Sequence, residues 1–525
     1  MQQTISIKVK PNEAFKNFLL KEIIAEQCNC KLKEVSGFQI IKRSIDARSK
    51  QPYYLLTIKA FINEPLQPTE KFDFIYQNVS NKKNVIIVGA GPAGLFAALR
   101  LIELGLKPIL IERGKNVRDR RRDLAKINRD GEVNSESNYC FGEGGAGTYS
   151  DGKLYTRSSK RGNVQRILHR FVEHGANHDI LVNAHPHIGT NHLPNIIASI
   201  REKIIECGAE IYFNKKVTSF IIKNNALKGA VCADGSTFEA DNLILATGHS
   251  ARDIFETLHH QNILIEAKPF ALGIRIEHPQ QIIDEQQYHC KIRDANLPPA
   301  SYNLVEQING KGVFSFCMCP GGIIAAAATQ PNEIVVNGWS PSKRNNPFAN
   351  SGMVVQVEKN EIEKSNMNID INSPLAFLQF QKNVEQKSFE MGGGKLVAPA
   401  QRMLDFVTGI TSTTLPNCSY HPGLKSVDLK QVLPPFITQS LQEAFTHFSK
   451  KMKGYYTNEA VLVATESRTS SPIRIPRDKE TMQHPQIKGL YPCAEGAGYA
   501  GGIMSAAMDG ENCAESIFNQ IFHTK

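Results

Sequence analysis

The sequence predicts an α/β protein with a discontinuous Rossmann-like domain of three-layer ββα character, an inserted antiparallel β+α domain and a small N-terminal α+β module. Two observations predict this class. At Asn84 an apolar run, a glycine-rich turn and an amphipathic segment follow one another, which is the pattern of a β-α-β unit. From about Phe270 to Asp478 short β-type runs replace that pattern, and a strand-loop-helix order returns at Leu490.

Composition places the chain among globular proteins. It has 525 residues, 41% hydrophobic and 21% charged, which excludes fibrous and disordered classes. The formal net charge of +10 suits an anionic cofactor, a nucleic acid or a membrane surface without selecting one. No apolar run approaches the about 18 residues that span a bilayer, and the first residues lack a signal-peptide pattern. The 11 cysteines include no C-x-x-C pair, so we expect reduced thiols and a cytoplasmic protein without membrane contact.

Residues 1–80 are predicted to form a separate β-α-β-β module. Residues 4–8 alternate like a strand, residues 12–27 have helical spacing, and two β-rich runs cover residues 38–45 and 53–61. Residues 65–80 carry Pro, Asn and Ser and are predicted to be a linker.

Residues 81–270 are predicted to be the first part of the Rossmann-like domain. The continuously apolar residues 85–88 are typical of a parallel strand buried on both faces. A helix follows and stops at Gly105, and residues 108–111 form the next strand, which ends at Glu112. We then expect a helix over residues 193–207, and strands over residues 209–213, 217–222, 227–232, 237–239 and 242–246.

Residues 271–480 are predicted to be the inserted antiparallel domain, and residues 481–525 the C-terminal part of the Rossmann-like domain. Strands are expected over residues 271–277, 312–318, 334–337 and 353–357. Ser373 and Pro374 are a good N-cap and first-turn pair for a helix that ends at residues 392–394.

The pattern G-x-G-x-x-G occurs three times, and its context separates the three. Gly89, Gly91 and Gly94 follow a buried strand and open a helix, and Glu112 lies about 20 residues further on. The first glycine makes the tight turn, the second admits a pyrophosphate, and the third lets helix and strand pack closely. The helix N-terminus attracts phosphate, and the Glu112 carboxylate can accept from ribose hydroxyls. This segment predicts a dinucleotide site.

The other two occurrences are not second dinucleotide folds. No buried strand precedes Gly142, Gly144 and Gly147, although so glycine-rich a loop can wrap a flat ring or a diphosphate; a flexible surface loop is the alternative. Gly496, Gly498 and Gly501 stand between a strand and a helix, but the sequence ends before a second strand with an acidic tip.

In this order, the three segments resemble two-dinucleotide-binding-fold flavoproteins that bind FAD. In that group an apolar strand ending Ala-Thr-Gly passes near the cofactor, here at residues 245–248, and a C-terminal acid-Gly element meets the ribityl chain, here Glu495 and Gly496. The group usually has Asp where Glu495 stands. Residues 144–154, 466–472, 495–502 and 42–48 further resemble a family of uncharacterised FAD-dependent dehydrogenases over almost the whole chain.

The resemblance implies FAD and redox chemistry, and it leaves the substrate and the electron donor open. NADH or NADPH as a transient reductant is one alternative, because no second β-α-β fingerprint exists for it. The residues that the motifs and the resemblance together assign to the cofactor are Gly89, Ala90, Gly91, Pro92, Ala93, Gly94, Glu112, Arg113, Gly144, Gly145, Gly147, Val217, Thr247, Gly248, Glu495, Gly496, Gly502 and Ile503.

Two charged features have open interpretations. The helix that begins near Gly501 would direct its positive end toward the flavin ring and favour an anionic reduced flavin. The basic run Arg113, Lys115, Arg118, Arg120, Arg121 and Arg122 either contacts a diphosphate or forms a solvated helix face, and the solvated face is favoured.

Histidine and cysteine clusters give no recognisable metal site, and none is predicted. Five histidines between His174 and His192 lack a ligand spacing and are interpreted as loop or cleft residues. Cys317 and Cys319 would share one strand face, and packing is favoured because redox pairs usually use other spacings. Cys140 and Cys493 flank the proposed flavin loops, where a reactive thiol is the less favoured interpretation. The catalytic residues are not identified; the candidates for substrate chemistry are Lys153, His187 and Arg468.

The favoured function is an FAD-dependent oxidoreductase that moves a hydride between flavin and an unidentified small organic substrate bound between the two larger domains. Three alternatives stay open: a flavin-dependent monooxygenase, an RNA-associated flavoprotein and a non-enzymatic flavin-binding scaffold. The RNA alternative has the net charge and Lys42, Arg43, Arg48 and Lys50 in its favour, with little aromatic interleaving. Nucleic acid is therefore the less favoured partner.

Overall fold

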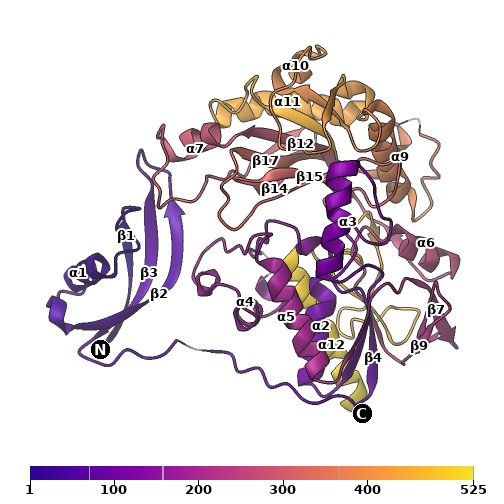
Figure 1. The fold of residues 1–525 in the computed structure, drawn as a ribbon, viewed down its shortest axis with the longest axis horizontal. Coiled ribbons are helices and arrows are strands. Elements are labelled where there is room, and N and C mark those ends of the chain that lie inside the picture. The colour runs from indigo at the N-terminus through magenta and orange to yellow at the C-terminus, as the bar shows by residue number, and fades with distance from the viewer. Residues whose placement is uncertain (70, 157–158, 366, 524–525) are drawn as a thin grey trace.

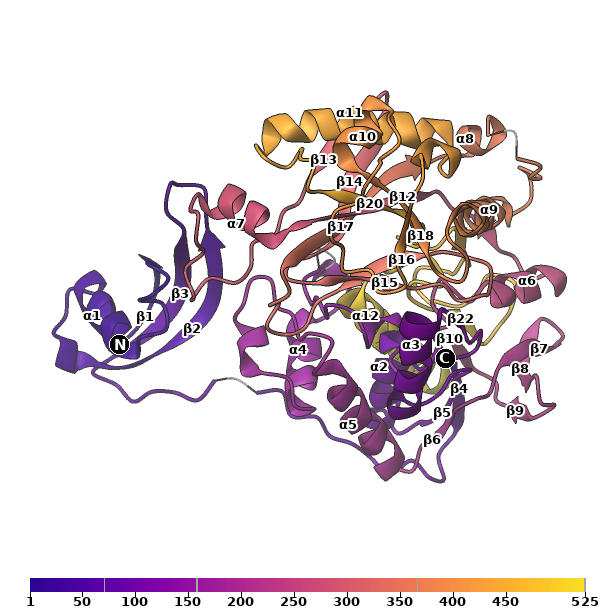
Figure 2. The ribbon, with the colours of Figure 1, turned by 45° about the horizontal axis from the view of Figure 1, so that its top comes forward.

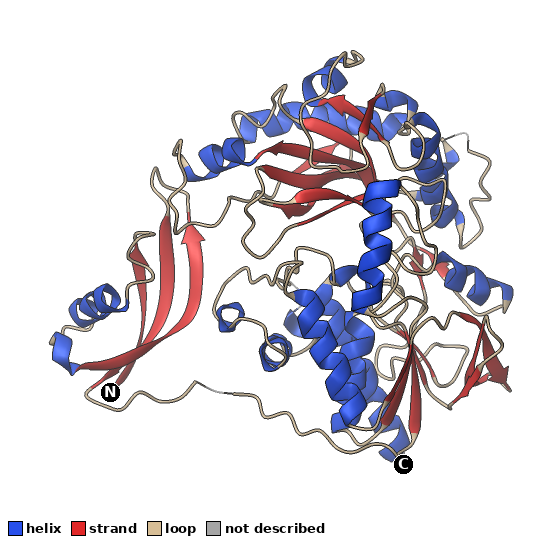
Figure 3. Ribbon diagram, in the orientation of Figure 1, coloured by secondary structure: helices blue, strands red, loops and turns tan. Residues whose placement is uncertain are grey.

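A computed structural model describes residues 1–69, 71–156, 159–365 and 367–523. Figure 1 shows a small N-terminal module beside a larger body, and in that body a mixed sheet with helices stands over a parallel sheet with helices. Figure 3 shows the same arrangement by element type. Within the described residues, no helix combines the length and the apolarity that crossing a membrane requires.

The N-terminal module is a three-stranded antiparallel sheet with one helix. Its strands are β1 (Gln2–Val9), β2 (Val35–Asp46) and β3 (Tyr53–Ile62), in the order β1-β3-β2, and α1 spans Asn17–Gln27. The helix therefore begins later than the predicted residue 12. Strand β2 docks on the larger body, since the Arg43 amide donates to the Val182 carbonyl and the Ala184 amide donates to the Arg43 carbonyl.

The Rossmann-like fold is confirmed. A five-stranded parallel sheet has the order β22-β10-β4-β5-β6, so strands far apart in the sequence lie side by side. Its strands are β4 (Asn84–Val88), β5 (Lys107–Ile111), β6 (Glu210–Tyr212), β10 (Leu243–Leu245) and β22 (Leu490–Pro492). Helices α2 (Pro92–Glu103), α5 (Leu193–Glu206) and α12 (Ile503–Phe522) pack on one face through a shared apolar core.

The other face of this sheet carries a second, antiparallel sheet. It consists of β7 (Val217–Lys223), β8 (Ala226–Cys232) and β9 (Thr237–Glu239). Phe220 and Leu227 belong to the same apolar cluster as Ile86 and Val88 of β4. The sequence of layers is therefore β-sheet, β-sheet and helices, as the predicted ββα character requires.

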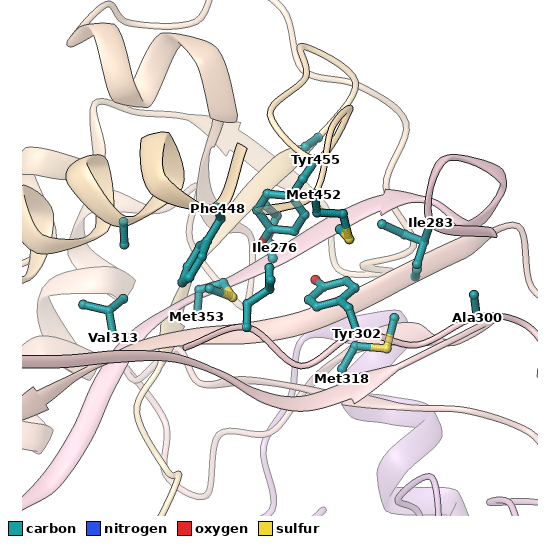
Figure 4. Close-up of a cluster of buried hydrophobic side chains, with 14 of the residues drawn as sticks. Ile276, Ile283, Ala300, Tyr302, Val313, Met318, Met353, Phe448, Met452 and Tyr455 are labelled. Atoms are coloured by element: carbon teal, nitrogen blue, oxygen red, sulfur yellow. The ribbon is translucent and has the colours of Figure 1, made fainter. Parts of the chain in front are cut away.

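The mixed sheet that stands over the parallel sheet has seven strands, in the order β13-β14-β17-β12-β20-β18-β19. Its strands are β12 (Phe270–Pro279), β13 (Val305–Ile308), β14 (Lys311–Cys319), β17 (Phe348–Val357), β18 (Ala398–Arg402), β19 (Leu424–Ser426) and β20 (Val461–Glu466). One pair, β18 with β19, is parallel, so the sheet is mixed and not purely antiparallel as predicted. Figure 2 shows helix α11 (Pro435–Lys451) over its outer face, and Figure 4 shows the apolar side chains between them, including Phe448 and Met353.

Three predicted starts on this sheet's side of the molecule differ from the structure by two residues or more. The strand predicted over residues 334–337 is β16 (Val336–Trp339), which begins two residues later, at Val336. Helix α9 spans Ala376–Met391, because the Ser373 hydroxyl accepts from the Leu375 amide in a turn that precedes the helix. Strand β17 begins at Phe348 because it pairs with β12 along its whole length. The remaining elements are α3 (Val117–Asp130), α4 (Val164–Glu173), α6 (Arg252–His260), α7 (Gln280–Tyr288), α8 (Lys359–Glu363), α10 (Met403–Thr408), β11 (Glu266–Ala267), β15 (Ile323–Ala326) and β21 (Ile473–Arg474).

Candidate functional site

A cavity of about 310 Å³ lies between the carboxyl ends of the parallel strands and the seven-stranded sheet. Ligands of open α/β sheets bind at this edge. Two walls of unlike chemistry enclose the cavity. We call the loops after β4, β10 and β22, together with residues 140–147, the glycine wall. We call Lys153, Phe316, Cys317, Cys319, Asn337 and Gly338 the sheet wall.

The first glycine loop has the geometry that its motif predicts. Gly89 has φ +106°, and a Cβ there would lie 2.4 Å from the Ala246 carbonyl oxygen. A Cβ on Gly94 would lie 1.9 Å from the Gly89 carbonyl oxygen, so this position fixes the approach of helix to strand. A Cβ on Gly91 would meet its nearest neighbour only at 4.0 Å, because this glycine faces the cavity. Gly91 therefore has space for a ligand beside it, whereas Gly89 and Gly94 are packed against backbone atoms.

A buried arginine holds the second glycine loop in place. The Arg120 side chain is fully buried, and its guanidinium donates to the carbonyls of Asn138 at 2.8 Å, Tyr139 at 2.7 Å, Glu143 at 2.8 Å and Gly145 at 2.9 Å. The favoured prediction of a solvated helix face is therefore wrong for Arg120, although it fits Arg122, whose side chain is 78% exposed. Helical spacing turns Arg120 inward, where it satisfies carbonyls that a glycine-rich loop cannot satisfy itself.

Glu112 ties the two glycine loops together. One carboxylate oxygen accepts from the Ala90 amide at 2.8 Å, and the other accepts from the Gly114 amide at 2.8 Å and the Gly142 amide at 3.0 Å. A carboxylate offers about four acceptor positions, and these amides use three of those of Glu112, which also lines the cavity. Its neighbour Arg113 also lines the cavity and pairs with Glu136 and Asp253.

Two helices begin at the glycine wall. The N-cap residues of α2 and α12, Gly91 and Gly502, have no side chain to cap the helix, and the first residues of both helices line the cavity. Such ends attract anionic groups. At the start of α12 the Glu495 carboxylate accepts from the Gly502 amide, and it lies 3.6 Å from Nε2 of His249.

The glycine wall contains polar atoms without hydrogen-bond partners, among the described residues, and glycines with open space beside them. Within the described part of the chain, the Thr247 hydroxyl and Nδ1 of His249 are buried without a hydrogen-bond partner, and both residues line the cavity. A Cβ on Gly248, Gly501 or Gly502 would meet no heavy atom within 4 Å. Burial lowers the pKa of His249, with Glu495 opposing, so the imidazole is neutral at neutral pH. A backbone cradle with unpaired polar atoms and two helix N-termini fits a dinucleotide such as FAD.

The sheet wall holds charges and sulfur. Nζ of Lys153 lies 3.3 Å from the Asp151 carboxylate and 3.8 Å from Sγ of Cys319, and it donates to the Met318 carbonyl. Burial would raise the pKa of Asp151, but Lys153 and Arg344 outweigh it and hold that pKa below its usual range. Removal from bulk solvent inside the cavity raises the pKa of the Cys317 thiol to about 12, against the opposing effect of Lys153. The surface of Cys317 that stays exposed faces the cavity.

The structure separates the three candidates for substrate chemistry. Lys153 and Arg468 line the cavity. Arg468 is fixed in a buried network, since its guanidinium donates to Glu385 at 3.0 Å and to the Thr329 hydroxyl at 2.8 Å. His187 does not line the cavity; its Nε2 lies 3.1 Å from the Ser342 carbonyl oxygen, and its backbone pairs with that of Lys153.

The predicted cofactor residues fall mostly on the cavity surface. Those that line it are Gly89, Gly91, Pro92, Ala93, Glu112, Arg113, Gly145, Gly147, Val217, Thr247, Gly248, Glu495, Gly502 and Ile503. Ala90, Gly94, Gly144 and Gly496 lie behind it in the same loops. Sequence reasoning missed His249, Asp151 and Arg275. His249 had a signal, because it directly follows the Ala-Thr-Gly strand end.

The two cysteines that flank the predicted flavin loops have different surroundings. Cys140 lines the cavity and accepts from the Ser250 hydroxyl at 3.3 Å, whereas Cys493 is buried beside Cys513 and Asp509. The ligand atoms of these last three residues lie within 4.8 Å of one another. Both oxygens of the Asp509 carboxylate accept from the Arg477 guanidinium, whose positive charge disfavours a metal cation there.

The fold and the cavity define the class of protein as an FAD-dependent oxidoreductase. Residues 269–469 match the family model of FAD-dependent proteins, C-terminal domain-like, and residues 83–255 match that of pyridine nucleotide-disulphide oxidoreductases. Residues 1–61 match a domain of unknown function. An uncharacterised protein of Clostridium beijerinckii is 38% identical over 521 residues, 96% of each chain. This chain belongs to the same family of uncharacterised FAD-dependent proteins, and its cofactor is FAD.

More distant similarity is confined to parts of the sequence or to the fold. Thiamine thiazole synthase of Aeropyrum pernix is 25% identical over 209 residues, which is 37% of this chain and 65% of that protein. Glycine oxidase of Bacillus cereus has a TM-score of 0.31 at 13% identity, over 84% of this chain and 96% of that one. The halogenase PltM has a TM-score of 0.36 at 11% identity, over 84% of this chain and 69% of that one.

Proposed function

We propose that this protein moves a hydride between its flavin and a small organic substrate held against the sheet wall. The observation that carries the proposal is one cavity with a side-chain-poor wall suited to a dinucleotide and, facing it, a wall of charged and sulfur-bearing side chains. Bound FAD supplies the hydride chemistry, and the protein supplies position and electrostatics.

The residues of the chain have separate tasks in this proposal. Gly91 and Gly145 let the cofactor approach the backbone, and the N-termini of α2 and α12 neutralise its negative charge. The positive end of α12 also favours an anionic reduced flavin, which a redox titration with pH tests directly. Lys153 and Asn337 present hydrogen-bond donors to a polar substrate, and Phe316 and Ile254 restrict the entry of water.

The proposal is tested with purified, flavin-loaded protein. We expect flavin absorbance in the visible spectrum, and anaerobic bleaching by NADH, by NADPH or by an organic substrate from a reductant screen. Oxygen consumption coupled to a hydroxylated product would favour the monooxygenase alternative instead. If no reductant of biological potential bleaches a fully loaded flavin, the hydride-transfer proposal is wrong.

RNA association is a weaker candidate on the contacts of the N-terminal module. Of the basic residues that favour it, Arg43 is buried and pairs with Asp179 at 2.8 Å, and Arg48 pairs with Asp46 at 2.8 Å. These pairs occupy charges that phosphate contacts would need. Copurification of RNA that is lost with added salt would reverse this preference.

A further inference from the structure

The end of strand β14 is irregular where it meets the cavity. Phe316 pairs with Gly352 and Cys319 pairs with Asn350, so β14 carries one extra residue in a bulge. Cys317 stands in this bulge with φ +44°, in the left-handed region that favours glycine. A bulge changes the direction in which a side chain points. A cysteine in a conformation suited to glycine also strains the backbone.

At the bulge, the side chains of residues 317–319 face different surroundings. Met318 is buried and points into the apolar cluster beside Tyr302 (Figure 4). Cys317 and Cys319 both line the cavity that also contacts the glycine wall. The prediction that packing explains both cysteines therefore fails for Cys317, because its side chain is not covered by the core.

Cationic groups surround the sulfur of Cys319. Its Sγ lies 3.6 Å from Nη2 of Arg275 and 3.8 Å from Nζ of Lys153. Arg275 is fully buried and is held by Glu466 at 2.6 Å and Asn350 at 2.8 Å, so its position is fixed. Cations beside a sulfur stabilise the negative charge that it takes up as the leaving group in thiol-disulfide exchange.

The two cysteines are also folded toward each other. The Cys319 thiol donates to the carbonyl oxygen of Cys317 at 3.2 Å, so its sulfur turns back toward residue 317. A regular strand would instead extend the chain between these two positions. The Cys319 sulfur therefore lies against the backbone of Cys317.

We propose that Cys317 and Cys319 form a redox-active dithiol-disulfide pair that exchanges an electron pair with the flavin. This inference rests on the proposed function. When the S–S bond breaks, the two sulfurs take up two electrons and two protons and become two thiols. Reduced flavin supplies both electrons and one proton as it returns to the oxidised form, and solvent supplies the second proton. In the reverse direction, oxidised flavin receives the electron pair as the S–S bond forms.

The pair gives the protein a second store of two electrons beside the cofactor. Cys317 faces the cavity, so its sulfur is the one open to a small disulfide or thiol substrate, and Cys319 is the buried partner that closes the ring. A thiol substrate reacts with the oxidised pair as its own thiolate: it bonds to the Cys317 sulfur, the S–S bond breaks, and the Cys319 sulfur leaves and takes up a proton.

An anaerobic reductive titration tests this inference. Flavin-loaded protein is oxidised with ferricyanide, desalted and titrated with dithionite. We expect the wild-type protein to take up four electrons per FAD, and the variants Cys317→Ser, Cys319→Ser and Cys317→Gly to take up two. Cys317→Gly removes the thiol and relieves the positive φ, so it also guards against a folding defect. Cys290→Ser, a change outside the cavity lining, is the matched control and should keep four.

The alternative results have distinct meanings. Wild-type protein that retains FAD and takes up only two electrons overturns the inference while leaving the proposed function in place. Protein that holds no flavin contradicts the proposed function itself. Alkylation before and after reduction, followed by peptide mass analysis, should place the two newly labelled thiols at Cys317 and Cys319. A disulfide at any other pair would also overturn the inference.

Discussion

The two walls of the cavity present different chemical groups to a ligand. The glycine wall presents backbone, and two side chains outside it, Arg120 and Glu112, hold its loops in place. The sheet wall presents side chains directly, and its Lys153, Cys317 and Cys319 face the cavity. In the function that we propose, the glycine wall binds the cofactor through its shape and backbone polarity, and the sheet wall carries the reactive groups.

The largest effect is expected from removing Arg120, which holds a loop of the glycine wall in place. Arg120→Met should destabilise the protein by about 3–5 kcal/mol, because four loop carbonyls lose a buried charged donor. FAD retention should fall with it. Thermal unfolding and the flavin-to-protein absorbance ratio measure both effects. Arg122→Met changes an exposed arginine on the same helix and should alter neither. An Arg120→Met protein as stable as the wild type would contradict the role of Arg120 in holding the second glycine loop.

A second prediction concerns the sheet side of the molecule. Burial raises the pKa of Glu277 on β12 to about 7, against hydrogen bonds from Ser419. The folded state therefore keeps a proton that the unfolded state releases near the ordinary value of 4.5. The resulting stability is fully present below about pH 4.5 and is lost as the pH rises through 7, by about 3 kcal/mol in total.

Glu277→Gln should remove this dependence, because the amide is neutral at every pH. Urea midpoints at pH 5 and pH 8 should then lie closer together than in the wild type. Glu459→Gln, a change at an exposed residue near the same sheet, should leave the wild-type dependence unchanged. Identical pH dependence in Glu277→Gln and the wild type would show that Glu277 is ionised throughout.

The third prediction concerns a side chain introduced at Gly91, on the cavity side of the glycine wall. Gly91→Leu places a side chain in the space that the cofactor is expected to occupy, and FAD binding should weaken at least a hundredfold, about 2.7 kcal/mol. Gly91→Ala should have a smaller effect, because its Cβ meets no atom of the protein closer than 4.0 Å. Ultrafiltration with flavin fluorescence gives both binding constants. Full FAD retention by Gly91→Leu would refute the placement.

The smallest expected effect sharpens the role of the sheet wall. Lys153→Met removes one of the cations beside Sγ of Cys319 and should make the proposed disulfide harder to reduce by about 30 mV, a tenfold change in equilibrium. FAD binding should change less than in Gly91→Leu. Equilibration with a dithiol buffer measures the potential, and Lys160→Met, an exposed lysine of the same segment, is the control. A shift toward easier reduction would contradict the electrostatic argument.

Local patterns predicted the glycine wall well and the sheet wall poorly. The β-α-β unit with Gly89 and Gly91 is readable because its strand, turn and helix are consecutive. The inward turn of Arg120 depends on carbonyls of a loop that follows its helix, and a basic run does not indicate which arginine will be buried. The exposure of Cys317 depends on a bulge set by pairing between β14 and β17, which spacing within one strand cannot reveal.

The order of strands in the parallel sheet has a consequence for the synthesis of this protein. Strand β10 ends at Leu245, yet its outer neighbour β22 begins only at Leu490, after the whole seven-stranded sheet has been translated. Until β22 and α12 leave the ribosome, β10 is an unpaired edge and the cavity lacks Glu495 and the helix N-terminus that follows it. The nascent chain therefore cannot assemble the complete cavity that we propose for the flavin until its last strand and helix are available.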